Sequence, residues 1–91
     1  MTFEFAKYPD GTLAVFSNIG KKDNGEEYLS VTFERPMPYG FDTLVIEIPG
    51  YKIILEDGNY SVEEKKMFME IAKNGASFFF KYARLGGLEI A

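Results

Sequence analysis

The stretch that decides the fold runs from Ser61 to Gly87 and reads SVEEKKMFMEIAKNGASFFFKYARLGG. It is the only long segment in which apolar residues recur at helical spacing, and it contains the densest apolar cluster of the chain. The residues before it have the pattern of short strands and turns. We therefore expect this segment to be helical and to cover one face of a β-sheet.

The first part of the segment has the signals of a capped helix. Ser61 and Glu64 form a capping-box pattern, in which each side chain accepts a hydrogen bond from the backbone of the other residue. Apolar residues follow at helical intervals: Val62, Met67, Phe68, Ile71 and Ala72. Asn74-Gly75 predicts the end of this helix, because glycine adopts the positive φ of a C-terminal cap without strain.

A second helical run is expected after this stop, and Gly86-Gly87 is expected to end it. Its apolar stripe consists of Phe78, Phe79, Tyr82, Ala83 and Leu85. We interpret the stripe as core, with a ligand-binding box as the less favoured alternative. Three residues off the stripe form a candidate basic-aromatic contact for RNA or an acidic partner: Phe80, Lys81 and Arg84. The pattern is compatible with one helix or two.

Composition indicates one folded domain over residues 1–91. The chain is 46% hydrophobic, which argues against disorder, and no apolar run approaches the ~18 residues of a membrane span. Cysteine and histidine are absent, so there is neither a disulfide framework nor the usual general base and metal ligand. We expect a cytoplasmic protein that has no signal peptide, cofactor, metal or membrane partner.

The N-terminal residues predict a β-hairpin. Residues 2–8 alternate in hydrophobicity as a half-buried strand does, and Pro9-Asp10-Gly11 is a strong turn signal. The register expected from a three-residue loop pairs Tyr8 with Thr12, Phe5 with Val15 and Phe3 with Ser17. This register places Leu13 and Val15 on the same inward face as Phe3 and Phe5, so the turn and the hydrophobic pattern agree.

Three further strands are expected over residues 27–35, 41–48 and 51–56, joined by short turns that favour consecutive antiparallel pairing. Two prolines interrupt the chain between the first two of these strands. They predict a stiff connection that presents Met37 and Tyr39 to a partner, or a loop folded over the core. The predicted fold is α+β: a five-stranded antiparallel β-meander with one face covered by one or two C-terminal α-helices.

Strand alternation assigns each side chain to one of two faces. The face expected beneath the helices carries Phe3, Phe5, Leu13, Val15, Leu29, Val31, Phe33, Leu44, Ile46, Ile48, Ile53 and Leu55. The opposite face is expected to carry Glu4, Ala14, Phe16, Tyr28, Ser30, Thr32, Thr43, Val45, Glu47, Lys52 and Ile54. This second face mixes apolar and polar residues, so it is a candidate interface.

No catalytic pattern is present in the sequence. It contains no phosphate-binding glycine loop, nucleophile elbow or paired metal-binding motif. The polar loop GKKDNG at residues 20–25 lacks the ligand spacing of a calcium site, so we interpret it as a solvated hairpin tip. We expect no enzyme, and an enzyme that works without histidine or cysteine is the least favoured alternative.

The favoured function is a non-enzymatic protein-binding module that acts stoichiometrically, as a regulator or inhibitor, with self-association included. Small acidic proteins of phages and other mobile elements often have this character, which is an analogy only. The candidate partner-binding residues are Phe16, Tyr28, Val45, Ile54, Met37 and Tyr39. The alternative is single-stranded nucleic-acid binding through aromatic residues of the open sheet face. The net charge of −4 disfavours that alternative.

Overall fold

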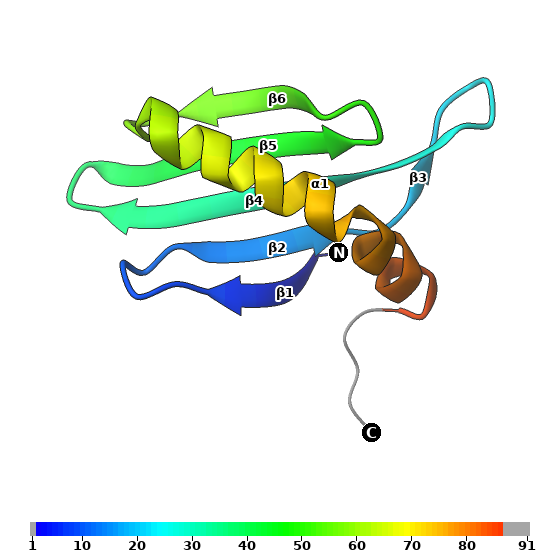
Figure 1. Ribbon diagram of the computed structural model, residues 1–91, viewed down its shortest axis with the longest axis horizontal. Coiled ribbons are helices and arrows are strands. Elements are labelled where there is room, and N and C mark those ends of the chain that lie inside the picture. Colours follow the sequence, from blue (N-terminus) through cyan, green and yellow to red (C-terminus); the bar gives the residue numbers. More distant parts are fainter. Residues whose placement is uncertain (1, 87–91) are drawn as a thin grey trace.

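The computed structural model describes residues 2–86, in which an antiparallel sheet carries one helix on one of its faces (Figure 1). The elements are β1 (Thr2–Lys7), β2 (Leu13–Ser17), β3 (Gly20–Lys21), β4 (Glu27–Met37), β5 (Gly40–Ile48), β6 (Lys52–Asp57) and α1 (Val62–Arg84). The main strand order is β1-β2-β4-β5-β6, and the short β3 pairs with β4. The α+β class and the consecutive antiparallel pairing are therefore confirmed.

Helix α1 begins at the predicted capping box. The Glu64 amide donates to the Ser61 hydroxyl oxygen at 3.1 Å, and the Ser61 amide donates to a Glu64 carboxylate oxygen at 2.8 Å. These two bonds satisfy amides that a helix N-terminus otherwise leaves without partners. The sequence signal and the local structure agree at this end of α1.

The predicted stop at Asn74-Gly75 is wrong, because α1 continues through these residues to Arg84. A β-carbon added at Gly75 would lie 2.8 Å from ring atoms of Phe79, one turn further along. Gly75 therefore makes room for a buried ring and does not cap the helix. The end itself is marked by Gly86, which has a φ of +87°; Gly87 lies outside the described residues.

The buried stripe of α1 differs from the predicted one. Phe68, Ala72 and Phe79 are fully or almost fully buried, and Gly75 falls on the same line at helical spacing. Four residues expected in the core are instead exposed: Val62, Met67, Phe78 and Leu85. A continuous helix buries a single stripe of side chains. The predicted break would have let each half of the segment bury a different stripe.

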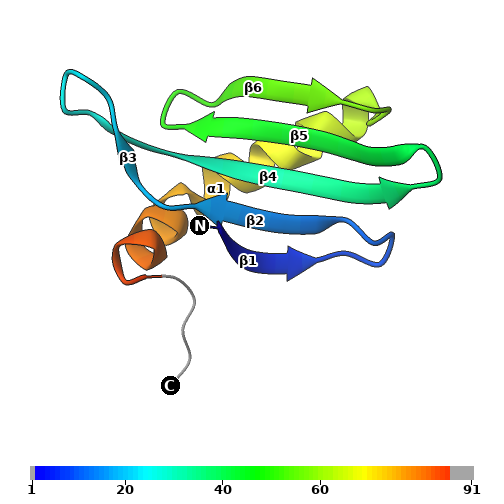
Figure 2. The same cartoon turned by 180° about the vertical axis from the view of Figure 1, so that it is seen from behind.

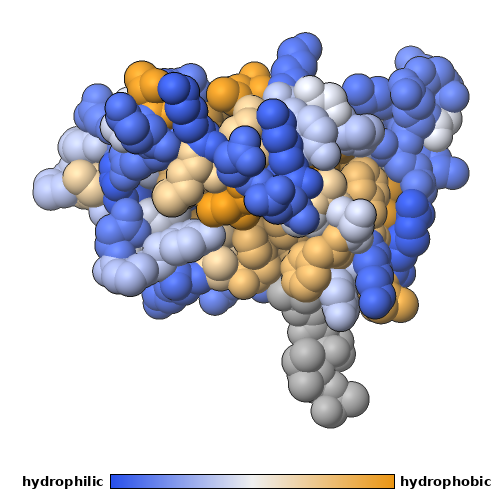
Figure 3. Space-filling model, in the orientation of Figure 1, coloured by the Kyte–Doolittle hydropathy of each residue, from blue (hydrophilic) through white to orange (hydrophobic). Residues whose placement is uncertain are grey.

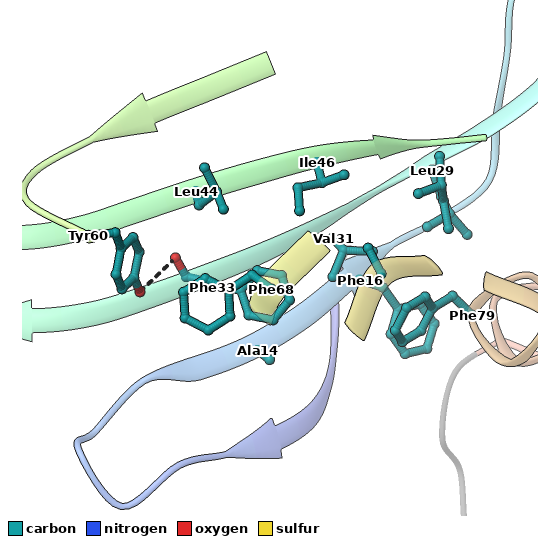
Figure 4. Close-up of a cluster of buried hydrophobic side chains, with 12 residues drawn as sticks. Ala14, Phe16, Leu29, Val31, Phe33, Leu44, Ile46, Tyr60, Phe68 and Phe79 are labelled. Carbon is teal, nitrogen blue, oxygen red and sulfur yellow. Dashed lines mark hydrogen bonds between the residues drawn. The ribbon is translucent and has the colours of Figure 1, made fainter. Parts of the chain in front are cut away.

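Stacked and edge-on aromatic rings join α1 to the sheet (Figure 4). The rings of Phe33 and Phe68 stack with centroids 4.2 Å apart, and Phe79 packs at 5.2 Å from Phe16. Tyr60 meets Phe68 edge-on and donates its hydroxyl to the Phe33 carbonyl at 3.2 Å. Aromatic pairs of this kind add stabilisation beyond the area that they bury, so this cluster fixes the position of α1.

The predicted hairpin register holds next to the turn and fails beyond it. The Tyr8 amide donates to the Thr12 carbonyl at 2.9 Å, as expected. The register then shifts at a bulge between Glu4 and Ala6, so that Phe3 lies opposite Phe16. A bulge places one extra residue on one strand and changes which side chains share a face.

The bulge corrects the predicted faces of β2. Ala14 and Phe16 point toward α1 and have no exposed surface, while Leu13 and Val15 lie on the opposite face. The expectation that Phe16 is available to a partner on the open face is therefore wrong. Because side chains alternate along a strand, a register shift of one residue moves each side chain of β2 to the face opposite the predicted one.

The prediction that Ile53 and Leu55 share a core-facing side of β6 is also wrong. A second bulge separates them, since Ile46 lies opposite Ile53 while the neighbouring Val45 lies opposite Leu55. All six residues of β6 are exposed. Helix α1 leaves the β6 end of the sheet diagonally and covers the middle strands (Figure 1), so β6 remains an edge strand.

The proline-containing connection is a tight hairpin and not an extended loop. Strand β4 runs to Met37 and pairs it with Gly40 of β5. Pro36 has no amide hydrogen to donate to a neighbouring strand. It is tolerated in β4 because β2 pairs with β4 only as far as Glu34 and does not reach Pro36.

Candidate functional site

The candidate site is the sheet face turned away from α1, which we call the open face. Seen from behind in Figure 2, no described helix or loop crosses it. A central row runs across the sheet in direct register: Glu4, Val15, Thr32, Val45 and Leu55. Three of its members are aliphatic, so the middle of the open face is apolar.

Charged and polar residues border this central row on both sides. One neighbouring row contains Lys7, Leu13, Glu34, Thr43 and Asp57. The other contains Ser17, Ser30, Glu47 and Lys52. Across the three rows, Glu4, Glu34, Glu47 and Asp57 outnumber Lys7 and Lys52. Lys22 neutralises Glu47 at 3.1 Å, so the open face keeps a small negative charge.

The open face is hollowed at the end where Phe41 lies opposite Pro36. Phe41 is 55% exposed and lines a hollow of about 370 Å³ together with Leu13 and the charged side chains of Lys7 and Glu34. An exposed phenylalanine beside a hollow provides both a contact and a recess for a side chain of a partner. Phe41 was not predicted as a contact residue, because the sequence pattern indicates the start of a strand there but not which face its side chain takes.

Of the predicted contact residues in the strands, Val45 and Ile54 lie where a partner can reach them. Val45 is half-buried in the central row, and Ile54 is the exposed extra residue of the β6 bulge. Leu55, 52% exposed, joins Val45 on the open face although it was predicted for the core. The alternation pattern would have assigned Leu55 to the open face only if the position of the bulge had been known.

Tyr28 lies on the open face but is half-covered by its own chain. Its ring occupies the space beside Gly20, where an added β-carbon would lie 2.7 Å from the ring. The Lys22 ammonium lies 5.7 Å from the ring centroid and forms an ion pair with Glu47 at 3.1 Å. Tyr28 therefore supports the hairpin that contains β3 and does not offer an open ring for base stacking.

The turn residues Met37 and Tyr39 have different surroundings. Met37 is half-buried at the end of β4, whereas Tyr39 is exposed. The Tyr39 hydroxyl donates to a carboxylate oxygen of Asp42, which is fully buried. This hydrogen bond holds the Tyr39 ring against the turn and raises the pKa of its hydroxyl.

Arg35 and its partners form a polar cluster beside this turn. The guanidinium binds Asp42 through Nε at 3.0 Å and Nη2 at 2.7 Å, and it reaches Glu64 at 2.5 Å. It also contacts Asp10 at 3.3 Å and lies over the Tyr60 ring with its carbon 4.8 Å from the centroid. The guanidinium donates four hydrogen bonds to carboxylates from three regions of the chain, so we interpret the cluster as a structural clamp.

The pKa shifts in this cluster follow from its hydrogen bonds. Donation from Tyr39, and then from the Asn59 amide and Arg35, holds the pKa of Asp42 below its usual value. The Ser61 amide first, and Arg35 second, lower the pKa of Glu64. The carboxylates are thus held in the charged form, which is unsuited to a general acid.

The three residues of the predicted basic-aromatic contact do not form a common surface. Phe80 is half-buried against the core, and Lys81 lies with its ammonium 5.5 Å from the Tyr82 ring centroid. Arg84 forms a two-pronged ion pair with Glu27 at 2.6 and 2.9 Å. On this side of the molecule, apolar surface gathers beside α1 (Figure 3). The ring of Phe78, which belongs to α1, is exposed.

Residues 2–86 contain no group of three carboxylate, histidine or cysteine side chains placed to hold a metal ion. Within the same residues, α1 is not apolar enough over any long window to cross a bilayer. Comparison with known proteins gives no match, since no family model, curated protein or solved structure matches this chain.

Proposed function

We propose that the chain is a protein-binding module without catalytic activity, which acts stoichiometrically as a regulator or inhibitor and binds its target through the open face. The observation that carries this proposal is the central row of that face. Val15, Val45 and Leu55 align across the sheet, and no described element covers them.

The layout of the open face has the anatomy of a protein interface. An apolar centre is surrounded by a polar border, and the Phe41 hollow adds a recess of about 370 Å³. The buried centre of an interface is more apolar than its rim, is depleted of charged residues and is enriched in aromatic rings. The open face supplies both the aliphatic row and one exposed aromatic ring.

The charge of the border indicates the chemistry of the partner. Glu4, Glu34 and Asp57 lie around the aliphatic row, and the whole chain carries a net charge of −4. The expected partner is a protein surface with an apolar ridge bordered by lysine or arginine. Complementary charges of this kind mainly speed association and select the partner, so binding should weaken as salt is added.

Nucleic-acid binding has less support as the alternative. Phe16, one of its two stacking residues, is fully buried, and Tyr28 packs against Gly20. The border of the open face is acidic, which repels phosphate. Phe41 is the one aromatic residue of the described open face that remains exposed, and a single ring makes a poor base-stacking platform.

The experiment that tests the proposal is capture from a lysate of the source organism, with and without nuclease. We expect a protein that survives nuclease and is lost with Val45→Glu and with Leu55→Glu. Met67→Glu is the matched control, because Met67 is similarly exposed, at 48% against 52% for Leu55, but lies on α1. A charge buried in an interface should reduce capture by tenfold or more, on the order of 1.4 kcal/mol.

Circular dichroism of each variant separates lost binding from lost folding. Capture that is equal for Val45→Glu and Met67→Glu would show that the open face is not the contact surface. Capture that disappears with nuclease would point to nucleic acid and contradict the proposal.

A further inference from the structure

We propose that β6 pairs in antiparallel fashion with β6 of a second copy of this chain. Strand β6 forms one edge of the sheet, and no described element lies beyond it (Figures 1 and 2). Its outer backbone groups are free to continue the sheet. The side chains of the other edge strand, β1, are more buried than those of β6, because Phe3 and Phe5 pack against the core.

The side chains of β6 are unusual for a free edge. Ile53, Ile54 and Leu55 are consecutive and are 40%, 48% and 52% exposed. Proteins generally protect edge strands with charges or prolines, because an apolar edge invites pairing with another strand. Three adjacent exposed aliphatic residues at an edge are instead expected where a partner strand covers them.

The two ends of β6 carry opposite charges on the same face. Lys52 lies opposite Glu47 and Asp57 lies opposite Thr43, and both of those neighbours belong to the open face. Residues five positions apart in a regular strand point to opposite faces. The bulge at Ile54 adds one residue, and this extra residue returns Lys52 and Asp57 to a common face.

This arrangement is self-complementary. When β6 pairs with a two-fold-related copy, Lys52 lies opposite Asp57 of the second copy, and the same ion pair forms again at the other end. Between the two pairs, Ile54 lies opposite Leu55, so these two aliphatic side chains cover one another, while Ile53 lies opposite Glu56. Neither Lys52 nor Asp57 forms an ion pair among residues 2–86.

The same complementarity selects a second copy over an unrelated strand. An arbitrary extended peptide would need a carboxylate and an ammonium at the matching positions, whereas a second β6 supplies both by symmetry. The two-fold axis is perpendicular to the sheet, so both open faces would lie on the same side of one continuous sheet. The pairing does not depend on the target proposed for the open face.

The test is a charge exchange measured by sedimentation velocity over a range of protein concentrations. The natural chain should dimerise as concentration rises. Lys52→Asp alone and Asp57→Lys alone should each weaken dimerisation by about tenfold or more, because like charges then face one another twice. A mixture of the two single variants should form a mixed dimer, since every facing pair is again of opposite sign.

The double variant Lys52→Asp/Asp57→Lys is the matched control within one chain. It should dimerise about as well as the natural chain, although it keeps the new carboxylate opposite Glu47. A loss caused only by damage to the β5–β6 pairing would persist in the double variant and in the mixture, and would overturn the proposal.

A natural chain that stays monomeric at every concentration would also overturn the pairing. That outcome leaves the proposed target binding intact, because Val45→Glu probes the open face on β5, away from the edge. Conversely, a dimer that is rescued by the mixture while capture is insensitive to Val45→Glu would support the β6 pairing and contradict the proposed function.

Discussion

At the scale of single residues, Gly75 has a different role from the one that its sequence context indicates. Asn74-Gly75 has the composition of a helix end, yet both residues lie inside α1. The deciding contact is the Phe79 ring, whose atoms would lie 2.8 Å from an added β-carbon at Gly75. The ring is almost fully buried and packs against Phe5 at 4.7 Å and Phe16 at 5.2 Å between centroids.

Gly75→Ala should therefore destabilise the protein, although the same change normally stabilises a helix interior by up to about 1 kcal/mol. We expect the free energy of unfolding, measured by urea denaturation, to fall by about 1–2 kcal/mol because the core becomes overpacked. Asn74→Ala is the control at the neighbouring exposed position and should be neutral or slightly stabilising. A gain in stability for Gly75→Ala would show that the ring can be displaced at little cost.

At the scale of elements, α1 combines a strong local signal with a position set by distant contacts. The capping box at Ser61 and Glu64 is complete, with bonds of 2.8 and 3.1 Å. Glu63 and Glu64 also place negative charge at the N-terminus, where the helix dipole favours it. The cap decides where α1 starts, whereas the ring of Phe68 against Phe33 decides which side faces the sheet.

Ser61→Ala should lower the free energy of unfolding by about 1 kcal/mol, because the Glu64 amide loses its partner. The measurement is thermal unfolding followed by circular dichroism. Ser77→Ala makes the same chemical change at an exposed position inside α1 and should have a small effect of opposite sign. Equal effects at the two positions would show that the cap contributes nothing specific.

At the scale of the whole molecule, the Arg35 cluster holds three regions together. Its carboxylate partners come from the β1–β2 turn at Asp10, from β5 at Asp42 and from the first turn of α1 at Glu64. Because Asp42 is fully buried, its charge requires these partners. The cluster thus connects the hairpin, the sheet and the helix at one end of the molecule.

The cluster predicts the response of the whole fold to acid. The pKa values of Asp42, Glu64 and Asp10 are all lowered in the folded state, chiefly by donation from Tyr39 and from the amides of Ser61 and Thr12 respectively. Lowered carboxyl pKa values contribute stability above the unfolded-state pKa of about 4, and this stability is lost as pH falls below it. The unfolding midpoint in urea should therefore be flat near neutrality and decrease from about pH 4 downward.

Arg35→Leu provides the control for the acid response. The substitution removes the Arg35 guanidinium, which is one of the causes that lower the pKa values of Asp10, Asp42 and Glu64. The variant should be less stable at neutral pH and should show a shallower dependence on acid. An unchanged acid dependence would assign the effect to other carboxylates, such as Glu27 beside Arg84.

The sequence by itself determined the elements that depend on neighbours in the chain. The cap at Ser61, the hairpin turn at residues 9–11 and the alternation of β4 and β5 were all predicted and are all present. Each of these depends on interactions within a few residues or on a strand without irregularity. The order of the strands followed from their short connections.

Only the tertiary structure decided which residues are available to a partner. Two bulges, at Phe5 and Ile54, changed the faces of β2 and of the part of β6 beyond Ile54, so Phe16 became core while Leu55 became surface. The same packing carried α1 through Gly75, since burying Phe79 against Phe16 requires the helix to continue. A bulge changes the face on which every side chain beyond it lies. Its position depends on contacts between strands, and local sequence patterns do not reveal these contacts.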